Sequence, residues 1–112
     1  TQIPNLYDHS RPFPQRTVDG VLVAGPYSAT DVETIGQLVN TQTEEFILSI
    51  STPHEVAEPY FRNEISLDEI ATDAAEVMTG VRCEGRCGSG TVYYLIRHAK
   101  GWAVRYAGPW LG

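Results

Sequence analysis

The last part of the chain alternates between bulky and smaller or polar side chains, a pattern that predicts a β-hairpin. Residues 91–106 read TVYYLIRHAKGWAVRY, with β-branched and aromatic runs on either side of Ala99-Lys100-Gly101. A three-residue loop ending in glycine favours a type I turn with a bulge, because glycine can take the left-handed conformation. In this register nearly all bulky side chains share one face, as the pairs His98–Trp102, Ile96–Val104 and Tyr94–Tyr106. The opposite face is mixed and carries Tyr93, Leu95, Arg97, Ala103, Arg105 and Ala107.

An amphipathic pattern over residues 30–40 predicts a helix. Thr30 followed by Glu33 fits a capping box at its start, and Asn40 suits a left-handed stop at its end. The apolar stripe of this helix consists of Val32, Ile35, Gly36, Leu38 and Val39. Strands are predicted on either side of it, over residues 21–24 and over residues 45–51, where apolar residues alternate with other residues.

Two local patterns compete in residues 65–81. Ser66 and Glu69 form a second capping box, and the apolar positions that follow keep helical spacing as far as Met78, which favours one long helix. Residues 77–83 can also form a strand that enters the glycine-rich segment 84–90 and pairs with residues 91–97. We interpret the segment as a short helix over residues 66–71, followed by a strand over residues 75–83.

Together these elements predict an α+β fold. A helix packed on a curved, mainly antiparallel sheet that ends in a C-terminal β-meander would bury the helix stripe and one face of the strands. Residues 1–16 contain three prolines and no periodicity, so they are expected to form an extended N-terminal arm. Residues 17–112 are expected to form a single domain.

The C-terminal half contains the segments A-E-V-M-T-G and G-x-G-T-V-Y-Y-L, followed by G-W-A-V and a closing G-P-W. In this pattern the chain resembles small proteins of the cystatin-like and nuclear transport factor two-like group. The resemblance covers residues 29–112 and implies a helix laid across a curved antiparallel sheet. The chain lacks the second and third helices that wall the pocket of the larger members, which argues against a deep ligand cavity.

The charge of the chain excludes one class of partner. The formal net charge is −6, so the chain lacks the excess of Lys and Arg that nucleic-acid binding requires. Acidic residues crowd the segment 44–76, which would suit a basic protein partner. No apolar run approaches the roughly 18 residues of a membrane helix, so we expect a soluble protein, cytoplasmic or exported. The start at Thr1 is compatible with a mature or a trimmed chain.

Cys83 and Cys87 lie in the glycine-rich sequence VRCEGRCGSG. The three residues between them allow a local disulfide, and two free thiols are equally compatible with the sequence. A zinc site needs more ligands at close spacing, and no second pair accompanies these cysteines. The sequence therefore predicts neither a metal nor a cofactor.

Residues 21–28 read VLVAGPYS, a hydrophobic strand followed by glycine, proline and the start of a helix. This segment resembles the opening of nucleoside deoxyribosyltransferases, where such a turn helps to hold a nucleoside. The resemblance implies a small enzyme acting on a nucleoside-like or other small molecule near Gly25, Tyr27 and Ser28. An Asp-rich, Gly-Thr turn with a placed glutamate nucleophile is missing from the later sequence. The enzyme is therefore an alternative, and no catalytic residue is assigned.

His54 and the aromatic residues supply further candidates. His54 stands next to Glu55 in T-P-H-E and could act as a general base, whereas His98 is expected to pack against Trp102 beside the hairpin turn. Aromatic side chains of the C-terminal half can line a concave sheet face or anchor an interface. The candidate ligand contacts are Gly25, Tyr27, Ser28, His54, Tyr60 and Trp102.

The predicted function is binding without catalysis, with a protein partner, a second copy of the chain or a small apolar ligand. The helix is expected to cover the bulky face of the hairpin, which would leave the mixed face exposed as a homodimer interface. The candidate interface residues are Tyr93, Leu95, Arg97, Ala103 and Arg105. Besides the small enzyme, an immunity-type inhibitor of a basic toxin is a second alternative.

Overall fold

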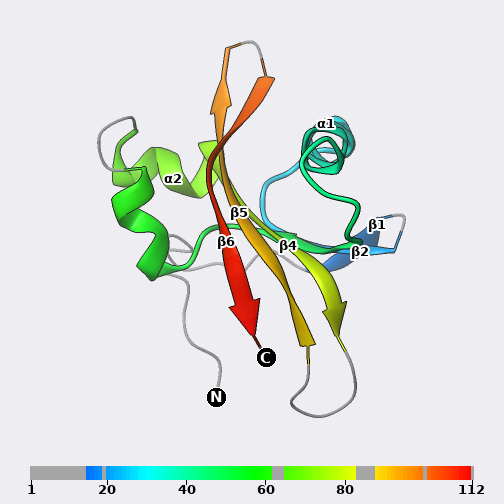
Figure 1. Cartoon of the computed structure of the whole chain (residues 1–112). Coiled ribbons are helices and arrows are strands. Elements are labelled where there is room, and N and C mark those ends of the chain that lie inside the picture. Colours follow the sequence, from blue (N-terminus) through cyan, green and yellow to red (C-terminus); the bar gives the residue numbers. More distant parts are fainter. Residues whose placement is uncertain (1–14, 19, 62–64, 83–87, 100, 112) are drawn as a thin grey trace.

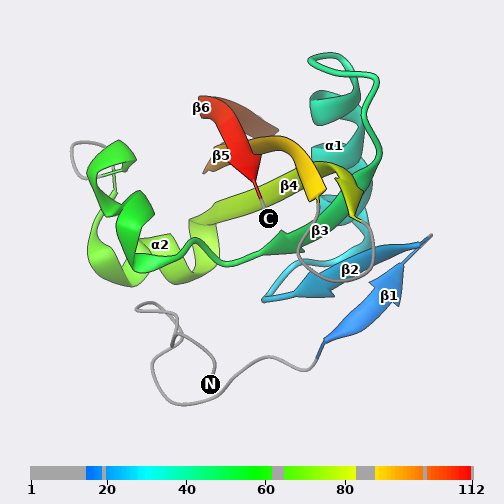
Figure 2. The same ribbon diagram turned by 60° about the horizontal axis from the view of Figure 1, so that its bottom comes forward.

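Six strands form one sheet in the described part of the chain, and they lie side by side in sequence order (Figure 1). The computed structural model describes residues 15–18, 20–61, 65–82, 88–99 and 101–111. The strands are β1 (Arg16–Val18), β2 (Val21–Ala24), β3 (Ile47–Ser51), β4 (Ala74–Arg82), β5 (Gly88–His98) and β6 (Gly101–Leu111). Figure 2 shows β1 and β6 at opposite edges of the sheet.

The sheet is antiparallel except between β2 and β3, which pair in parallel. Parallel neighbours need a crossover connection, and the helix α1 (Ala29–Asn40) provides it. Strands β4, β5 and β6 form the C-terminal meander. The predicted α+β class, the mainly antiparallel sheet and the final meander are thereby confirmed.

The N-cap of helix α1 is Ser28, two residues earlier than the predicted cap. The side chain of Ser28 accepts a hydrogen bond from the backbone N–H of Asp31 at 3.1 Å, and Asp31 accepts one from the Ser28 N–H at 3.1 Å. Thr30 and Glu33 match the same spacing, so the sequence offers two overlapping capping boxes, and the prediction of Thr30 was wrong. The predicted left-handed stop is also wrong, because α1 runs through Asn40 to a right-handed Thr41.

The segment that follows Ile65 changes from helix to strand without a loop. The helix α2 (Leu67–Asp73) is capped by Ser66, whose side chain accepts from the Glu69 N–H at 3.3 Å. Ala74 is already extended and begins β4, which pairs with β3 on one side and β5 on the other. The predicted short helix and strand are confirmed, because pairing on both sides outweighs the helical spacing of the apolar residues. A 3₁₀ helix, η1 (Glu55–Tyr60), lies between β3 and α2.

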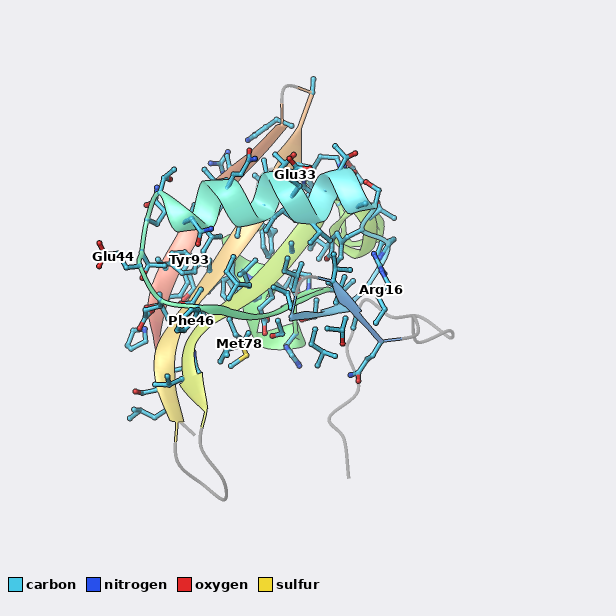
Figure 3. The ribbon with its side chains drawn as sticks, turned by 90° about the vertical axis from the view of Figure 1, so that its right-hand side faces the viewer. Arg16, Glu33, Glu44, Phe46, Met78 and Tyr93 are labelled. Carbon is cyan, nitrogen blue, oxygen red and sulfur yellow. The ribbon has the colours of Figure 1, made fainter. Side chains whose placement is uncertain are left out.

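Strand β5 is apolar on both of its faces. Tyr93, Tyr94, Leu95 and Ile96 are consecutive, and each is at most 7% exposed. Side chains alternate along a strand, so Tyr93 and Leu95 join a core cluster with the buried face of α1, which lies across the sheet (Figure 3). Tyr94 and Ile96 join a second cluster on the other side, with residues of η1 and α2. The sheet is therefore the middle layer between α1 and the pair η1 and α2.

The predicted assignment of the two hairpin faces was wrong except for Trp102 and Val104, which pack on the α1 side as expected. The helix α1 covers Tyr93 and Leu95, which are 4% and 0% exposed, so these side chains do not form the expected open surface. Ala103 lies on the opposite side of the sheet, against the second cluster. Because β5 carries large apolar residues on both faces, its alternation alone does not indicate which face a helix covers.

The hairpin register agrees with the prediction only away from the turn. Tyr94 pairs with Tyr106 as expected, but Ile96 pairs with Ala103 instead of Val104, and His98 pairs with Gly101. A register shift after Tyr94 absorbs the difference. Trp102 and Val104 consequently lie on the α1 side. Gly101 has φ +133°, in the region that favours glycine, but it begins β6 and pairs with His98. The predicted three-residue loop is therefore wrong, because only two residues separate the ends of β5 and β6.

Several predictions fall outside the described residues. These include most of the proposed arm, residues 1–14, and the two cysteines, Cys83 and Cys87. Arg16, the last residue of the predicted arm, belongs to β1. Among the described residues no helix is long and apolar enough to cross a membrane.

Substitutions at two glycines, one in the sheet and one in the helix α1, test how tightly each element is packed. A Cβ at Gly90 would lie 1.7 Å from the Thr79 carbonyl oxygen, whereas a Cβ at Gly36 in α1 would meet nothing closer than 3.8 Å. We expect Gly90→Ala to lower the free energy of unfolding by about 2 kcal/mol, because the backbone of β4 at Thr79 would have to move to make room for the new methyl group. Gly36→Ala is the matched control and should raise it by about 0.5–1 kcal/mol through helix propensity. Urea denaturation measures both, and equal effects of the two variants would contradict the β4–β5 contact.

Candidate functional site

The residues predicted to contact a ligand fall into two groups on opposite sides of the sheet. Tyr27 and Trp102 pack in or against the α1-side cluster, next to Gly25 and Ser28. His54 precedes η1 and Tyr60 is its last residue, and both lie on the other side. The six residues therefore do not form one site.

The group on the α1 side is engaged within the fold. Tyr27 is 2% exposed, and its hydroxyl donates to the Ala74 carbonyl at 2.6 Å. Its ring meets Trp102 edge to face at a centroid distance of 6.1 Å, and it occupies the space beside Gly25. Burial raises the pKa of Tyr27, so the hydroxyl stays protonated. The Ser28 side chain caps α1.

Arg97 joins three elements on this same side. Its Nη1 and Nη2 donate to the Asp31 carboxylate of α1 at 2.8 and 3.0 Å, and its Nε lies 3.3 Å from Asp73 Oδ1 at the end of α2. The guanidinium also lies 4.5 Å from the centroid of the Trp102 ring. The hydrogen bond from Arg97 lowers the pKa of Asp31. Arg97 thus joins α1, β5 and the end of α2, and the face that it flanks is covered by α1 instead of forming the predicted open interface.

Across the sheet, a buried carboxylate holds a histidine in a defined orientation. Glu76 of β4 is 6% exposed, and its Oε2 lies 2.9 Å from His54 Nδ1. The backbone N–H of His54 donates to Glu76 Oε1 at 3.1 Å. Because a carboxylate oxygen accepts, the Nδ1 atom carries the proton. The other ring nitrogen, Nε2, is then the one that can contact a ligand, and 47% of the His54 side chain is exposed.

The hydrogen bond to Glu76 raises the pKa of His54, although partial burial opposes the shift. Sequence reasoning selected His54 but paired it with its neighbour Glu55 and missed Glu76. The sequence did contain a signal for a buried and paired Glu76, because this residue is the one charged residue in the apolar run A-A-E-V-M. Charged residues are rarely buried unless they have a partner, so such a position points to a paired group.

Three tyrosine rings pack together next to this pair. The centroid distances are 4.3 Å for Tyr60–Tyr106, 5.2 Å for Tyr60–Tyr94 and 5.3 Å for Tyr94–Tyr106. Tyr94 is the neighbour of Glu76 across the β4–β5 ladder, and burial together with the Glu76 charge raises the pKa of Tyr94 to about 12. Tyr94 is 7% exposed, whereas Tyr60 is 43% exposed. The cluster therefore presents Tyr60 as its most exposed ring, packed on the half-buried Tyr106 and the buried Tyr94.

The candidate site consists of His54, Glu76, Tyr60, Tyr94 and Tyr106. It combines an accessible aromatic ring with an imidazole of fixed orientation, which suits binding through stacking and one directed hydrogen bond. In the described ranges, no group of three or more His, Cys, Asp or Glu side chains could hold a metal ion.

No protein-family model matches the chain, and neither a curated protein nor a solved structure is significantly similar to it. The resemblances to the cystatin-like and nuclear transport factor two-like group and to nucleoside deoxyribosyltransferases therefore stay predictions.

The pair of His54 and Glu76 should make stability depend on pH. A histidine whose pKa is raised in the folded state contributes its full stabilisation below about pH 6.5, its ordinary value, and loses it as the pH rises through the raised value. The free energy of unfolding of the unmodified chain should therefore fall as the pH rises above about 6.5 and through the raised pKa of His54. In His54→Gln this fall should be smaller.

Urea denaturation at several pH values measures the effect. His98→Gln is the control, because His98 is exposed beside Arg105 on the hairpin and should leave the fall unchanged. A fall that is equally large in His54→Gln and in the unmodified chain would show that the pair does not form.

Proposed function

We propose that the chain is a non-catalytic binding domain that holds a small aromatic compound at the Tyr60 ring. The observation that carries this proposal is the exposure of Tyr60, 43%, in a cluster whose other rings are buried, as in Tyr94, or half-buried, as in Tyr106. A large aromatic side chain left accessible on a rigid base supports ring-on-ring binding, because stacking then costs little conformational entropy.

The surroundings of the cluster support a small apolar ligand. Met78 and Val92 are half-buried and pair across β4 and β5, one row further along the same face as Glu76 and Tyr94. Leu22 of β2 shares this face through the β2–β3 and β3–β4 ladders and is 40% exposed. A planar apolar compound bound on Tyr60 would thus lie on the face of the sheet that also carries these apolar side chains.

The alternative of a nucleoside-acting enzyme at residues 25–28 has less support. The Tyr27 hydroxyl bonds to the Ala74 carbonyl, and Ser28 caps α1. Arg16 donates to the carbonyls of both Gly25 and Tyr27. These polar groups already have partners within the chain, so we favour the site at His54 and Tyr60.

Phenylacetamide, a neutral compound with one ring, is a suitable probe. We expect it to bind with a dissociation constant of about 1 mM, and we expect Tyr60→Ala to weaken binding at least about fivefold through loss of the stacking ring. Two-dimensional NMR titration measures the affinity and locates the shifted amides, which should centre on His54, Tyr60, Tyr94 and Tyr106.

Phe46→Ala is the matched control, since Phe46 is also an exposed aromatic residue, at 77%, but lies before β3 beside Gly80. It should leave the affinity unchanged, and acetamide, which lacks the ring, should not bind. Shifts that centre on another part of the chain, or equal losses in the two variants, would contradict the proposed site.

A further inference from the structure

Both oxygens of the Glu76 carboxylate are occupied by one residue. Oε1 accepts from the backbone N–H of His54, and Oε2 lies 2.9 Å from His54 Nδ1. The Glu76 side chain is 7% exposed, against 47% for His54. Of the two partners, a ligand can therefore reach the imidazole and not the carboxylate.

This difference in access decides which charge a ligand meets. When the imidazole is protonated, its accessible Nε2–H is a charged donor, while the negative charge that balances it lies buried behind it. A ligand cation would have to approach the imidazolium, whereas a ligand carboxylate could accept its hydrogen bond. The raised pKa of His54 keeps the protonated form populated further towards neutral pH.

The other titratable groups around the site do not supply a competing positive charge. Tyr94 on β5 and Tyr60 on η1 both have a raised pKa, so they stay neutral hydroxyls at physiological pH. Tyr106 on β6 adds a further phenol, and Glu58 on η1 is acidic. Among these described residues His54 is the one basic group, and it is joined to the tyrosine cluster through Glu76, which pairs with Tyr94 across the β4–β5 ladder.

We propose that the ligand of this site is a small aromatic carboxylate, whose ring stacks on Tyr60 and whose carboxylate accepts a hydrogen bond from His54. This inference rests on the proposed function. The proposed function places an aromatic ring on Tyr60, and the inference adds a carboxylate group to the compound that carries this ring. The buried Glu76 acts as a positioning residue, since it orients the imidazole and does not touch the ligand.

The experiment compares phenylacetate with its neutral isostere phenylacetamide at about pH 6 and pH 9, with phenylacetate ionised at both. We expect phenylacetate to bind about fivefold more tightly at the lower pH, where His54 is protonated, and phenylacetamide to bind equally at both. In His54→Gln the pH dependence of phenylacetate binding should disappear while phenylacetamide still binds. His98→Gln is the control and should keep the pH dependence.

The outcomes separate the two proposals. If phenylacetamide binds at Tyr60 but phenylacetate shows no pH dependence, or shows the same dependence in His54→Gln, the aromatic carboxylate is wrong and the binding domain stands. If neither compound binds the unmodified chain, both proposals are overturned. Circular dichroism of each variant establishes that it is folded before binding is compared.

Discussion

The burial of β5 on both of its faces is the constraint on which the rest of the structure depends. Four consecutive large side chains, Tyr93 to Ile96, would expose apolar surface on whichever side of the sheet was left open. One helix can cover one face only. The crossover helix α1 covers the first, and η1 with α2 must cover the second, which explains why the chain between β3 and β4 folds back over the sheet (Figure 2).

The candidate site is a consequence of that second cover. The segment η1 brings Tyr60 onto Tyr94 and Tyr106. His54, the residue before η1, forms a hydrogen bond with Glu76 on β4. The same packing that closes the core thus leaves an aromatic ring and an imidazole at its margin. Because the rings and the carboxylate are held by buried neighbours, the site needs little ordering when a ligand binds.

Arg97 illustrates how tertiary contacts can use residues that look functional in sequence. An arginine beside an aromatic residue on a predicted open strand suggests a surface for a partner. In the fold it binds Asp31, lies close to Asp73 and stacks on Trp102, so it joins the start of α1, β5 and the end of α2. Tyr27 and Ser28 are engaged in the same region, which gives the strand-to-helix turn less support as a site and favours the η1 side.

Local patterns in the sequence were sufficient for the class of the fold and for most of its elements. The amphipathic stripe of α1, the Ser66 cap of α2 and the alternation of the hairpin each depend on residues a few positions apart. His54 and Tyr60 could be selected as candidates for the same reason, from residue type and local context. Periodicity and capping act over short distances, so they can be detected without knowledge of the fold.

The tertiary structure decided what depends on residues far apart in sequence. The pairing of His54 with Glu76 spans 22 residues, and the contact of Arg97 with Asp31 spans 66. The face of β5 that α1 covers, and the register shift that carries Trp102 to that side, depend on how all six described strands pack together. A strand that is apolar on both faces fits either orientation locally, and only the burial of both faces at once selects one.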